Sequence, residues 1–589
     1  MKHQNITFGL LLWAVPFGLQ AQENTESNTD TTVSRQIEIV KEYNPTIKEA
    51  SKISTTPELK DNGTKKMNVS YSVWATPLIP GNDSVPALDY ALTGHTNKEY
   101  RRTGFLKLGA GNHTSFLGET YLPLYQTKKD LVELYGIHNS SFGKVRLTNH
   151  LYSDLNEDFR TKAKINDNFI KASYTHNIDV KELSTYLDFG YRGFNYYGYD
   201  GRTPMERDST PYDRDQSFTN FDAGIRFRSK TFIDKWNYDV QTNYQLFRTH
   251  DGLREHNIFT NLSGSMLVDN GQLNLSFNMF NIFTNLPDKT MPFNYAKAEN
   301  TDNSTVLMLR PAYVIKGKHS ELNIGVKTAF CIGQGRPASV MPDVLGNISI
   351  IRDYWFLYAG ITGDYAINNY RNMSKVNRYV ALDNRAEDTY TPIDVYVGSK
   401  INLFKYAMLD ANIGYKIISN PYFFVSDNCD TTAGNANGSF YNLTYGKDEG
   451  LFSAGLGLIT GWKEFIQLNL KGKYNKWAMS KNETPWMMPK TEFTATVSSV
   501  PIEDLRIWVA YNFMGGRKAL FKTRIGDQYA VQEHNMRNLN DLSLGATYKA
   551  MSCLNVFLNL NNILSNEYDF WYGNATQHFN LMGGVVINF

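Results

Sequence analysis

The chain ends in Phe579-Asn-Leu-Met-Gly-Gly-Val-Val-Ile-Asn-Phe589. Side chains of a β-strand point alternately to its two faces. Counted back from the end, one face of such a strand carries only apolar residues and one glycine, Gly583. The apolar residues are Phe579, Leu581, Val585, Ile587 and Phe589. This stretch therefore predicts a terminal strand with one apolar face and a final aromatic side chain.

A terminal strand of this kind is typical of bacterial outer-membrane β-barrels, whose outer face meets lipid. We expect its apolar face to be the signal that the barrel-assembly machinery recognises when it inserts the chain into outer-membrane lipid. That signal comprises Phe579, Leu581, Val585, Ile587 and Phe589. The expected location is the outer membrane of a Gram-negative bacterium.

The start of the chain predicts export. Lys2 and His3 form a short basic beginning, residues 8–19 are largely apolar, and Ala21 offers a small residue for cleavage. This order is that of a secretory signal peptide covering residues 1–21. A membrane anchor is the alternative, but the apolar run is shorter than the ~20 residues that a spanning helix needs.

The composition agrees with a barrel. Mean hydropathy is −0.42, as expected when only alternate strand residues face lipid and the others face a wet lumen. Aromatic residues make up 14% of the chain, with 37 Tyr and 34 Phe, and such rings favour the membrane–water boundary. A net charge of only +2 gives no electrostatic reason to bind nucleic acid. The 3 cysteines suggest neither a disulfide framework nor a zinc site.

Alternation with a period of two recurs from about residue 103 onward and favours strands over helices. It is clear in residues 236–246, 272–279 and 466–474, and residues 542–548 are expected to pair with 554–560. The polar faces would suit an aqueous lumen better than the core of a soluble sandwich, and no blade repeat supports a propeller. We therefore expect residues 101–589 to form an all-β, antiparallel transmembrane barrel of roughly 22 strands, within a range of about 16 to 24.

Turn residues separate the expected strands at Gly111 and Asn112, at 269–271, at 316–318, and at Gly515 and Gly516. Longer polar stretches lie near 197–215, 285–302, 369–390 and 425–440. Barrels of this class have short turns on the periplasmic side and longer loops outside. The long stretches are therefore expected to be extracellular loops.

Residues 22–100 are expected to form a separate periplasmic or luminal segment. Residues 22–34 are polar and predict a disordered lead. Ile37, Glu38, Ile39 and Val40 then form a short β-prone patch. Such a patch can add to the edge of another protein's sheet, or it can pack within this protein's own lumen. The residues leave both alternatives open.

The end of the chain resembles the last three strands of TonB-dependent receptors, in particular those of Bacteroidota. The resemblance lies in residues 542–548, 558–568, 571–573 and 579–589, including the Asn-Asn-Ile-Leu-Ser-Asn-Glu-Tyr turn of 561–568. It covers the last part of the chain well and the rest by pattern alone. Residues Glu38, Ile39 and Val40 also resemble the box by which these receptors engage TonB. The resemblance implies an outer-membrane receptor or transporter for nutrient uptake, with TonB and a surface lipoprotein as partners.

The chain departs from that family in front of the barrel. A wide barrel lumen normally carries a plug, and residues 22–100 are too few for the complete plug of the family. A second hypothesis is therefore a non-transporting barrel that serves as a subunit of an envelope or surface complex. The sequence contains no catalytic motif such as Gly-x-Ser-x-Gly or His-Glu-x-x-His. We expect no enzyme activity, no cofactor and no metal site.

Replacing Phe589 with Ser should leave the chain unassembled in the periplasm, because the apolar terminal face is lost. Fractionation of cells, with a gel that distinguishes the folded barrel from the heat-denatured chain, measures the outcome. Normal amounts of folded barrel in the outer membrane would contradict this interpretation of the terminus.

Overall fold

The computed structural model describes residues 103–146, 160–197, 215–287, 303–333, 335–382, 387–404, 407–426, 440–462, 465–480, 483–525 and 528–589. The chain divides into two units, Met1–Ala75 and Thr76–Phe589, and every described residue belongs to the second. The expected signal peptide, the segment 22–100 and the patch from Ile37 to Val40 lie outside the described residues.

Twenty-two strands form one antiparallel sheet. Their bounds are β1 Phe105–Gly111, β2 Ser115–Gln126, β3 Asp130–Ser141, β6 Ile165–Ile178, β7 Lys181–Asn195, β8 Asp215–Ser229, β9 Trp236–Thr249, β10 Arg254–Val268, β11 Gly271–Asn285, β12 Ser304–Lys316, β13 Ser320–Ile332, β14 Ala338–Ile351, β15 Trp355–Ala366, β16 Thr389–Phe404, β17 Ala407–Ser419, β20 Asp448–Trp462, β21 Ile466–Ala478, β22 Thr491–Ile502, β23 Leu505–Gly515, β26 Leu539–Met551, β27 Leu554–Asn561 and β30 Asn580–Asn588. Each pairs with the next of these strands along the chain. The expected strands at 236–246, 272–279, 466–474, 542–548 and 554–560 are all present.

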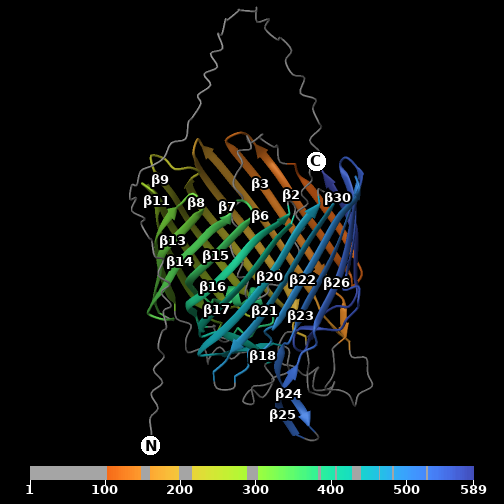
Figure 1. The fold of residues 1–589 in the computed structure, drawn as a ribbon. Helices are drawn as coiled ribbons and strands as arrows, with labels where there is room; N and C mark the ends of the chain where they lie inside the picture. Colours follow the sequence, from red (N-terminus) through yellow and green to blue (C-terminus); the bar gives the residue numbers. More distant parts are fainter. Residues whose placement is uncertain are drawn as a thin grey trace, which may run out of the picture. The chain divides into compact units, whose positions relative to one another are not determined.

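The sheet closes on itself where its first and last strands meet. β1 pairs with β2 on one side and with β30 on the other, in a register that joins Phe105 to Asn588 and Gly111 to Met582. Beyond the strand end, Gly104 and Phe589 exchange two backbone hydrogen bonds of 2.9 and 3.0 Å. The ring therefore has no free edge (Figure 1). The prediction of an all-β closed barrel of roughly 22 strands is confirmed.

The two faces of the strands differ as the alternation predicts. On β8, β10 and β11 the apolar Phe221, Leu262 and Leu275 are exposed on the outside. The polar residues next to them in sequence, such as Asp222 and Asn261, point the other way. An apolar exterior on a closed ring is stable in lipid, where about 1.5–3 kcal/mol is gained for each large aliphatic side chain kept from water. The barrel is an outer-membrane barrel on these grounds.

The two ends of the barrel differ in the length of their connections. At the end that holds Phe105 and Asn588, the turns are short, as at 179–180 and 503–504. At the other end, four two-stranded sheets lie in the described part of the loops. They are β4–β5 (Lys144–Arg146, Arg160–Lys162), β18–β19 (Tyr422–Ser426, Tyr441–Tyr445), β24–β25 (Lys518–Ile525, Gln528–Asn535) and β28–β29 (Asp569–Trp571, Asn574–Ala575). This asymmetry makes the loop end extracellular and the turn end periplasmic.

Two of the expected turns and loops have features that the sequence pattern did not predict. Gly515 and Gly516 separate two strands, but the second is β24 of the loop hairpin β24–β25, which projects at the loop end (Figure 1). The stretch 369–390 connects β15 to β16 at the loop end and contains the short helix α2 (Tyr370–Val376), which contacts Asp222 on the barrel wall. Among the described residues, no helix is long and apolar enough to cross a membrane.

Adjacent glycines of β30 provide a test of the closing seam. A Cβ on Gly584 would lie 2.1 Å from the carbonyl oxygen of Leu108 on β1, whereas a Cβ on Gly583 would come no nearer than 3.7 Å to Leu558. Gly584→Ala should lower the free energy of unfolding by about 1–3 kcal/mol through overpacking. Gly583→Ala should stay within about 0.5 kcal/mol of the parent. Denaturant unfolding of the folded barrel in detergent measures both, and equal midpoints would contradict the seam geometry.

Candidate functional site

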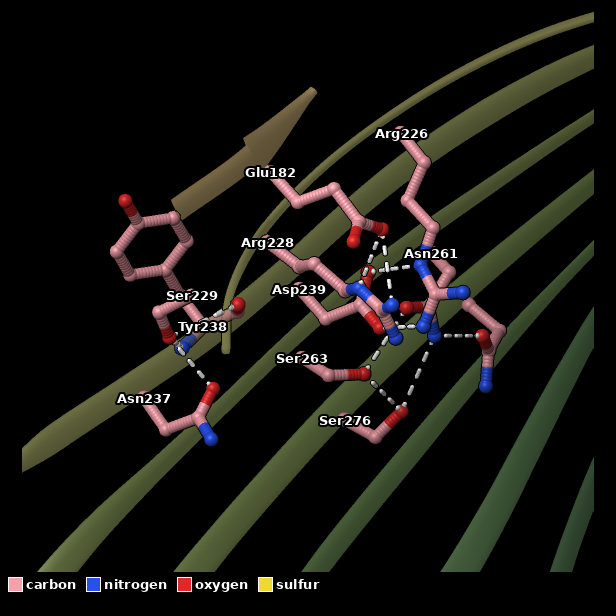
Figure 2. A network of polar contacts seen from close by, with 11 residues as sticks. Glu182, Arg226, Arg228, Ser229, Asn237, Tyr238, Asp239, Asn261, Ser263 and Ser276 are labelled. Atoms are coloured by element: carbon pink, nitrogen blue, oxygen red, sulfur yellow. Dashed lines mark hydrogen bonds and ion pairs between the residues drawn. The ribbon is translucent and has the colours of Figure 1, made fainter. Parts of the chain in front are cut away.

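The lumen wall near the turn end carries a ladder of paired polar side chains on β7, β8 and β9. Arg226 Nε donates a hydrogen bond of 2.8 Å to Asp239 Oδ1, and Arg228 Nε donates one of 2.9 Å to Glu182 Oε1. Figure 2 shows these side chains pointing toward one another across neighbouring strands. Because all four remain partly exposed, they line a wetted space rather than a packed core.

Uncharged side chains continue the ladder onto β10 and β11. Asn261 Nδ2 donates to Asn278 Oδ1 at 2.6 Å, and the hydroxyls of Ser263 and Ser276 lie 3.1 Å apart (Figure 2). Such groups exchange hydrogen bonds with water at little cost. This part of the wall therefore suits the passage of hydrated polar solutes.

A different arrangement occupies the loop end, where residues 367–382, with 387 and 388, form what we call the luminal loop. It leaves β15 and forms α2, and residues 387 and 388 lead into β16. Asn369 caps the helix by accepting the Asn372 N–H at 2.8 Å. At the base of the loop, Asp388 accepts the Asn368 N–H at 3.1 Å and the Tyr365 hydroxyl at 2.9 Å. The two ends of the loop are thus tied together.

Helix α2 is held against the barrel wall by two carboxylates. Arg371 forms an ion pair with Asp222 on β8, and their side chains are only 8% and 11% exposed. Glu255 on β10 is fully buried and accepts the backbone N–H of Tyr370 at 2.8 Å. The other oxygen of Glu255 accepts a hydrogen bond from Asn257 at 2.8 Å. Charge-assisted hydrogen bonds require a defined geometry between donor and acceptor, so these contacts fix the position of α2 on the wall.

The segment after α2 makes a second set of contacts with the wall. Arg378 binds both oxygens of Asp167 on β6, at 2.9 and 3.3 Å. Burial acts to lower the pKa of Arg378. The charge of Asp167, together with smaller effects of other groups, outweighs burial and raises the pKa above its ordinary value. Arg192 on β7 donates to the carbonyl oxygen of Ser374 at 3.3 Å. The loop is therefore anchored to β6, β7, β8 and β10.

These contacts require the luminal loop to cross the lumen. β6 is the fourth and β16 the fourteenth strand of the 22-membered ring, so they stand ten places apart, close to the maximum of eleven. Arg371 also reaches deep, because Asp222 is the central residue of β8 (Asp215–Ser229). The lipid-facing neighbour of Asp222 is the exposed Phe221. The loop thus enters the membrane-spanning part of the barrel.

Side chains of the luminal loop, of other loops and of strand ends bury one another in an apolar cluster, which we call the cap. Its fully buried members come from loops and strand ends that are distant in sequence. They are Tyr196, Phe218, Phe247, Leu253, Tyr370, Met373, Val380, Leu382, Tyr441 and Ala519, and Phe194, Tyr379, Ala381, Phe424, Met487, Met536 and Trp571 are nearly as buried. Burial of these side chains gives the cap a small hydrophobic core of its own.

Hydrogen bonds join the loops within the cap. The backbones of Tyr441 and the luminal loop pair through Tyr441 N–H to Tyr379 O at 3.0 Å and Ala381 N–H to Tyr441 O at 2.8 Å. The Tyr441 hydroxyl donates to Tyr572 O at 2.8 Å. Arg517 ties the hairpin β24–β25 to the same loops by donating to Phe570 O at 2.9 Å. The described part of the cap is therefore one connected structure over the lumen.

The residues expected to act from the sequence lie elsewhere. The patch Ile37, Glu38, Ile39 and Val40 is outside the described residues. Leu581, Val585 and Ile587 lie on β30, with Phe579 and Phe589 at its two ends, and Leu581, Ile587, Phe579 and Phe589 are exposed. Their role in insertion stays a prediction. In the described part of the chain, no group of three or more His, Cys, Asp and Glu is placed to hold a metal ion.

The sequence pattern predicts an extracellular loop at 369–390 but not its helix or its anchors on the wall. A helix of 7 residues is too short for a helical period to be recognised. The Asn at 369 before Tyr370 is the one local sign of a helix start. The carboxylates Asp167, Asp222 and Glu255 lie at inward positions of their strands, where any polar residue fits the alternation. The sequence pattern therefore does not distinguish them from other luminal residues.

Solved structures share this fold at low sequence identity. A mutant ferric enterobactin receptor of Pseudomonas aeruginosa, bound to enterobactin, has a TM-score of 0.61 at 10% identity, covering 83% of this chain and 81% of that chain. The FrpB iron transporter of Neisseria meningitidis has a TM-score of 0.61 at 9% identity, with 83% and 82% covered. The copper transporter OprC has a TM-score of 0.58 at 11% identity, with 83% and 82% covered. No protein-family model and no curated protein matches the sequence.

Buried phenols at the loop end should respond to alkali: Tyr422 and Tyr572 pack against the cap, and Tyr568 belongs to a separate cluster with Met514 and Leu539. Burial raises the pKa of Tyr422, Tyr568 and Tyr572 to about 12, whereas an unfolded tyrosine titrates near pH ~10. Their contribution to stability is therefore complete below pH ~10 and is lost as the pH rises toward ~12. Near-ultraviolet circular dichroism from the cap should fall in that interval, while the far-ultraviolet signal of the barrel persists.

The matched control replaces the three tyrosines with phenylalanine, which does not titrate. In the Tyr422→Phe, Tyr568→Phe, Tyr572→Phe protein, the near-ultraviolet signal should persist to a higher pH than in the parent. Tyrosinate absorbance that titrates with a single midpoint near pH ~10 for all tyrosines of the parent would show that these phenols are not protected.

Proposed function

We propose that this protein is an outer-membrane receptor and transporter that imports a nutrient through its lumen. The observation that carries the proposal is a closed 22-stranded ring with a polar, charge-lined lumen beneath a cap of extracellular loops. A wetted lumen gives a polar solute a path across the membrane, and the cap restricts entry at its outer end. The protein is proposed to act in binding and transport, without enzyme activity.

The structural neighbours support a nutrient as the cargo. They include a receptor for ferric enterobactin, an iron transporter and a copper transporter. Ferric enterobactin and copper are therefore the first solutes to test. The lumen wall offers both signs of charge, as in Arg226 and Asp239, so it does not by itself select an anion or a cation.

Energy coupling is the second part of the proposal and rests on the resemblance seen in the sequence. Residues 1–21 would direct export, residues 22–100 would form the periplasmic or luminal segment, and residues 101–589 the barrel. Ile37, Glu38, Ile39 and Val40 would add as a strand to TonB. A surface lipoprotein that delivers the nutrient is a further proposed partner, and the barrel-assembly machinery would insert the chain through β30.

The alternative is a non-transporting barrel that serves as a subunit of an envelope complex. One observation favours it: the described part of the cap has a buried aromatic core, in which Trp571 and Phe424 lie 4.9 Å apart between ring centroids. A permanent seal would have such a core. Purification in mild detergent distinguishes the two, because a subunit should bring stoichiometric partners and should show no uptake defect when it is deleted.

Deletion of residues 35–50 should abolish uptake, because the segment proposed to engage TonB is lost. Deletion of residues 22–34 in the neighbouring polar lead is the matched control and should leave uptake intact. The measurement is accumulation of radiolabelled iron as its enterobactin complex, and of radiolabelled copper, in cells that lack or carry each variant.

The outcomes separate the parts of the proposal. Uptake that survives deletion of residues 35–50 would remove energy coupling. Accumulation of iron, copper and other limiting nutrients that is the same with and without the whole protein would overturn import and leave the envelope subunit as the better account.

A further inference from the structure

We propose that the luminal loop is a gate, and that its ion pairs with β6 and β8 are the latch that holds the gate closed. The proposal deepens the proposed function and rests on it, since a gate has meaning only in a barrel that transports. It assigns the moving part to an extracellular loop folded into the lumen, and it names Arg371–Asp222 and Arg378–Asp167 as the contacts that break when the lumen opens.

The first argument is the position of the loop. Its chain leaves the wall at β15 and re-enters it at β16, yet it contacts β6, β7 and β8, which stand nine, eight and seven places from β15 in the ring of 22, as well as β10, five places away. Among the described residues, α2 contacts this wall through noncovalent interactions. The loop is covalently joined to the wall at β15 and β16 and contacts β6, β7, β8 and β10 only noncovalently. It can therefore separate from these four strands while it stays attached at its own ends.

The second argument is the chemistry of the contacts. Arg371 and Arg378 are paired with carboxylates, and Arg192 donates to a backbone carbonyl. Charged groups that lose a partner recover much of their free energy from water, whereas separated apolar surfaces do not. A polar latch can therefore open into a wetted lumen reversibly. Apolar contacts accompany the latch, because Tyr379 packs on Phe194 of β7 with 5.7 Å between ring centroids, so opening of the gate also separates these two rings.

The Arg371 contact is also incompletely satisfied. Its Nε and Nη1 atoms are buried and have no hydrogen-bond partner among the described residues. Burial of a charged group costs free energy unless its hydrogen bonds are complete. The closed state thus retains an unfavourable free energy from the incompletely hydrogen-bonded Arg371 where the loop contacts β8. Release of Arg371 into water would remove this cost.

The third argument concerns what moves together. Asp388 ties the two ends of the loop through Asn368 and Tyr365. Beyond α2, Tyr379 and Ala381 pair with Tyr441 of β19. The contacts to β18–β19 and to the loop base can persist while those to β6, β7, β8 and β10 separate. The gate therefore moves with the cap loops on its own side of the barrel.

A charge reversal with rescue tests the latch. Purified protein in a planar lipid bilayer is compared as the parent, Arg378→Asp, and the swapped double variant Arg378→Asp with Asp167→Arg. Arg378→Asp places two carboxylates together and should raise the open probability by at least about tenfold. The swap restores an opposite-charge pair and should return it to within about threefold of the parent.

The matched control is Arg352→Asp, which reverses the charge of an exposed arginine paired with an aspartate, Asp353. That pair lies in the turn between β14 and β15 at the turn end, outside the luminal loop and the ladder of the lumen wall. The open probability of this variant should equal that of the parent. Each variant is first shown to be folded by its heat-sensitive mobility on a gel.

A second readout reports access from outside the cell. Ser263→Cys places a thiol on the lumen wall of β10, three inward positions nearer the turn end than Asn257, in a protein whose Cys331, Cys429 and Cys553 are replaced by Ala. A polymer-linked maleimide added to intact cells should label this thiol at least about tenfold faster when Arg378→Asp is also present. The swap should restore slow labelling.

Folded Arg378→Asp protein with the conductance and labelling of the parent would overturn the gate, as would equal opening by Arg352→Asp or failure of the swap to restore closure. These results are independent of the uptake test. If nutrient uptake is normal but Arg378→Asp changes neither the open probability nor the labelling rate, the gate is wrong and the proposed function stands. If Arg378→Asp opens the lumen but the protein imports no nutrient, the proposed function is wrong.

Discussion

Every feature of this protein depends on one constraint, the need to satisfy backbone hydrogen bonds in a lipid environment. An open sheet edge within the hydrocarbon would leave N–H and C=O groups unpaired, at a cost of several kcal/mol for each group. The pairing of β1 with β30 removes that edge, and the exchange between Gly104 and Phe589 extends it to the last residue. The terminal strand is thus part of the closure of the barrel.

Closure on this scale creates a second problem, because a ring of 22 strands encloses more space than its own inward side chains can fill. Near the turn end, the inward residues pair with one another along the wall, as Arg226 does with Asp239. Near the loop end, residues 370–378 of the luminal loop pair with β6, β7, β8 and β10. The same inward positions therefore line a polar space at one end and anchor a loop at the other.

The cap and the luminal loop divide their stability between two kinds of interaction. Apolar burial holds the loops to one another and to the loop ends of β7, β8 and β9, through Phe194, Phe218 and Phe247. Charge pairs add contacts between the luminal loop and β6 and β8, through Arg378 and Arg371. Separated charges are hydrated more readily than separated apolar surfaces.

The sequence by itself determined the barrel, its approximate strand number and the orientation of its strand faces, because alternation with a period of two is local and each strand repeats it. The pairing of 542–548 with 554–560 followed from a short turn between them. The partnership of Arg371 with Asp222 and of Arg378 with Asp167 was decided only by the tertiary structure. These partners are separated by 149 and 211 positions in the chain, and only the curvature of the closed ring brings β6 and β8 opposite the loop that leaves β15.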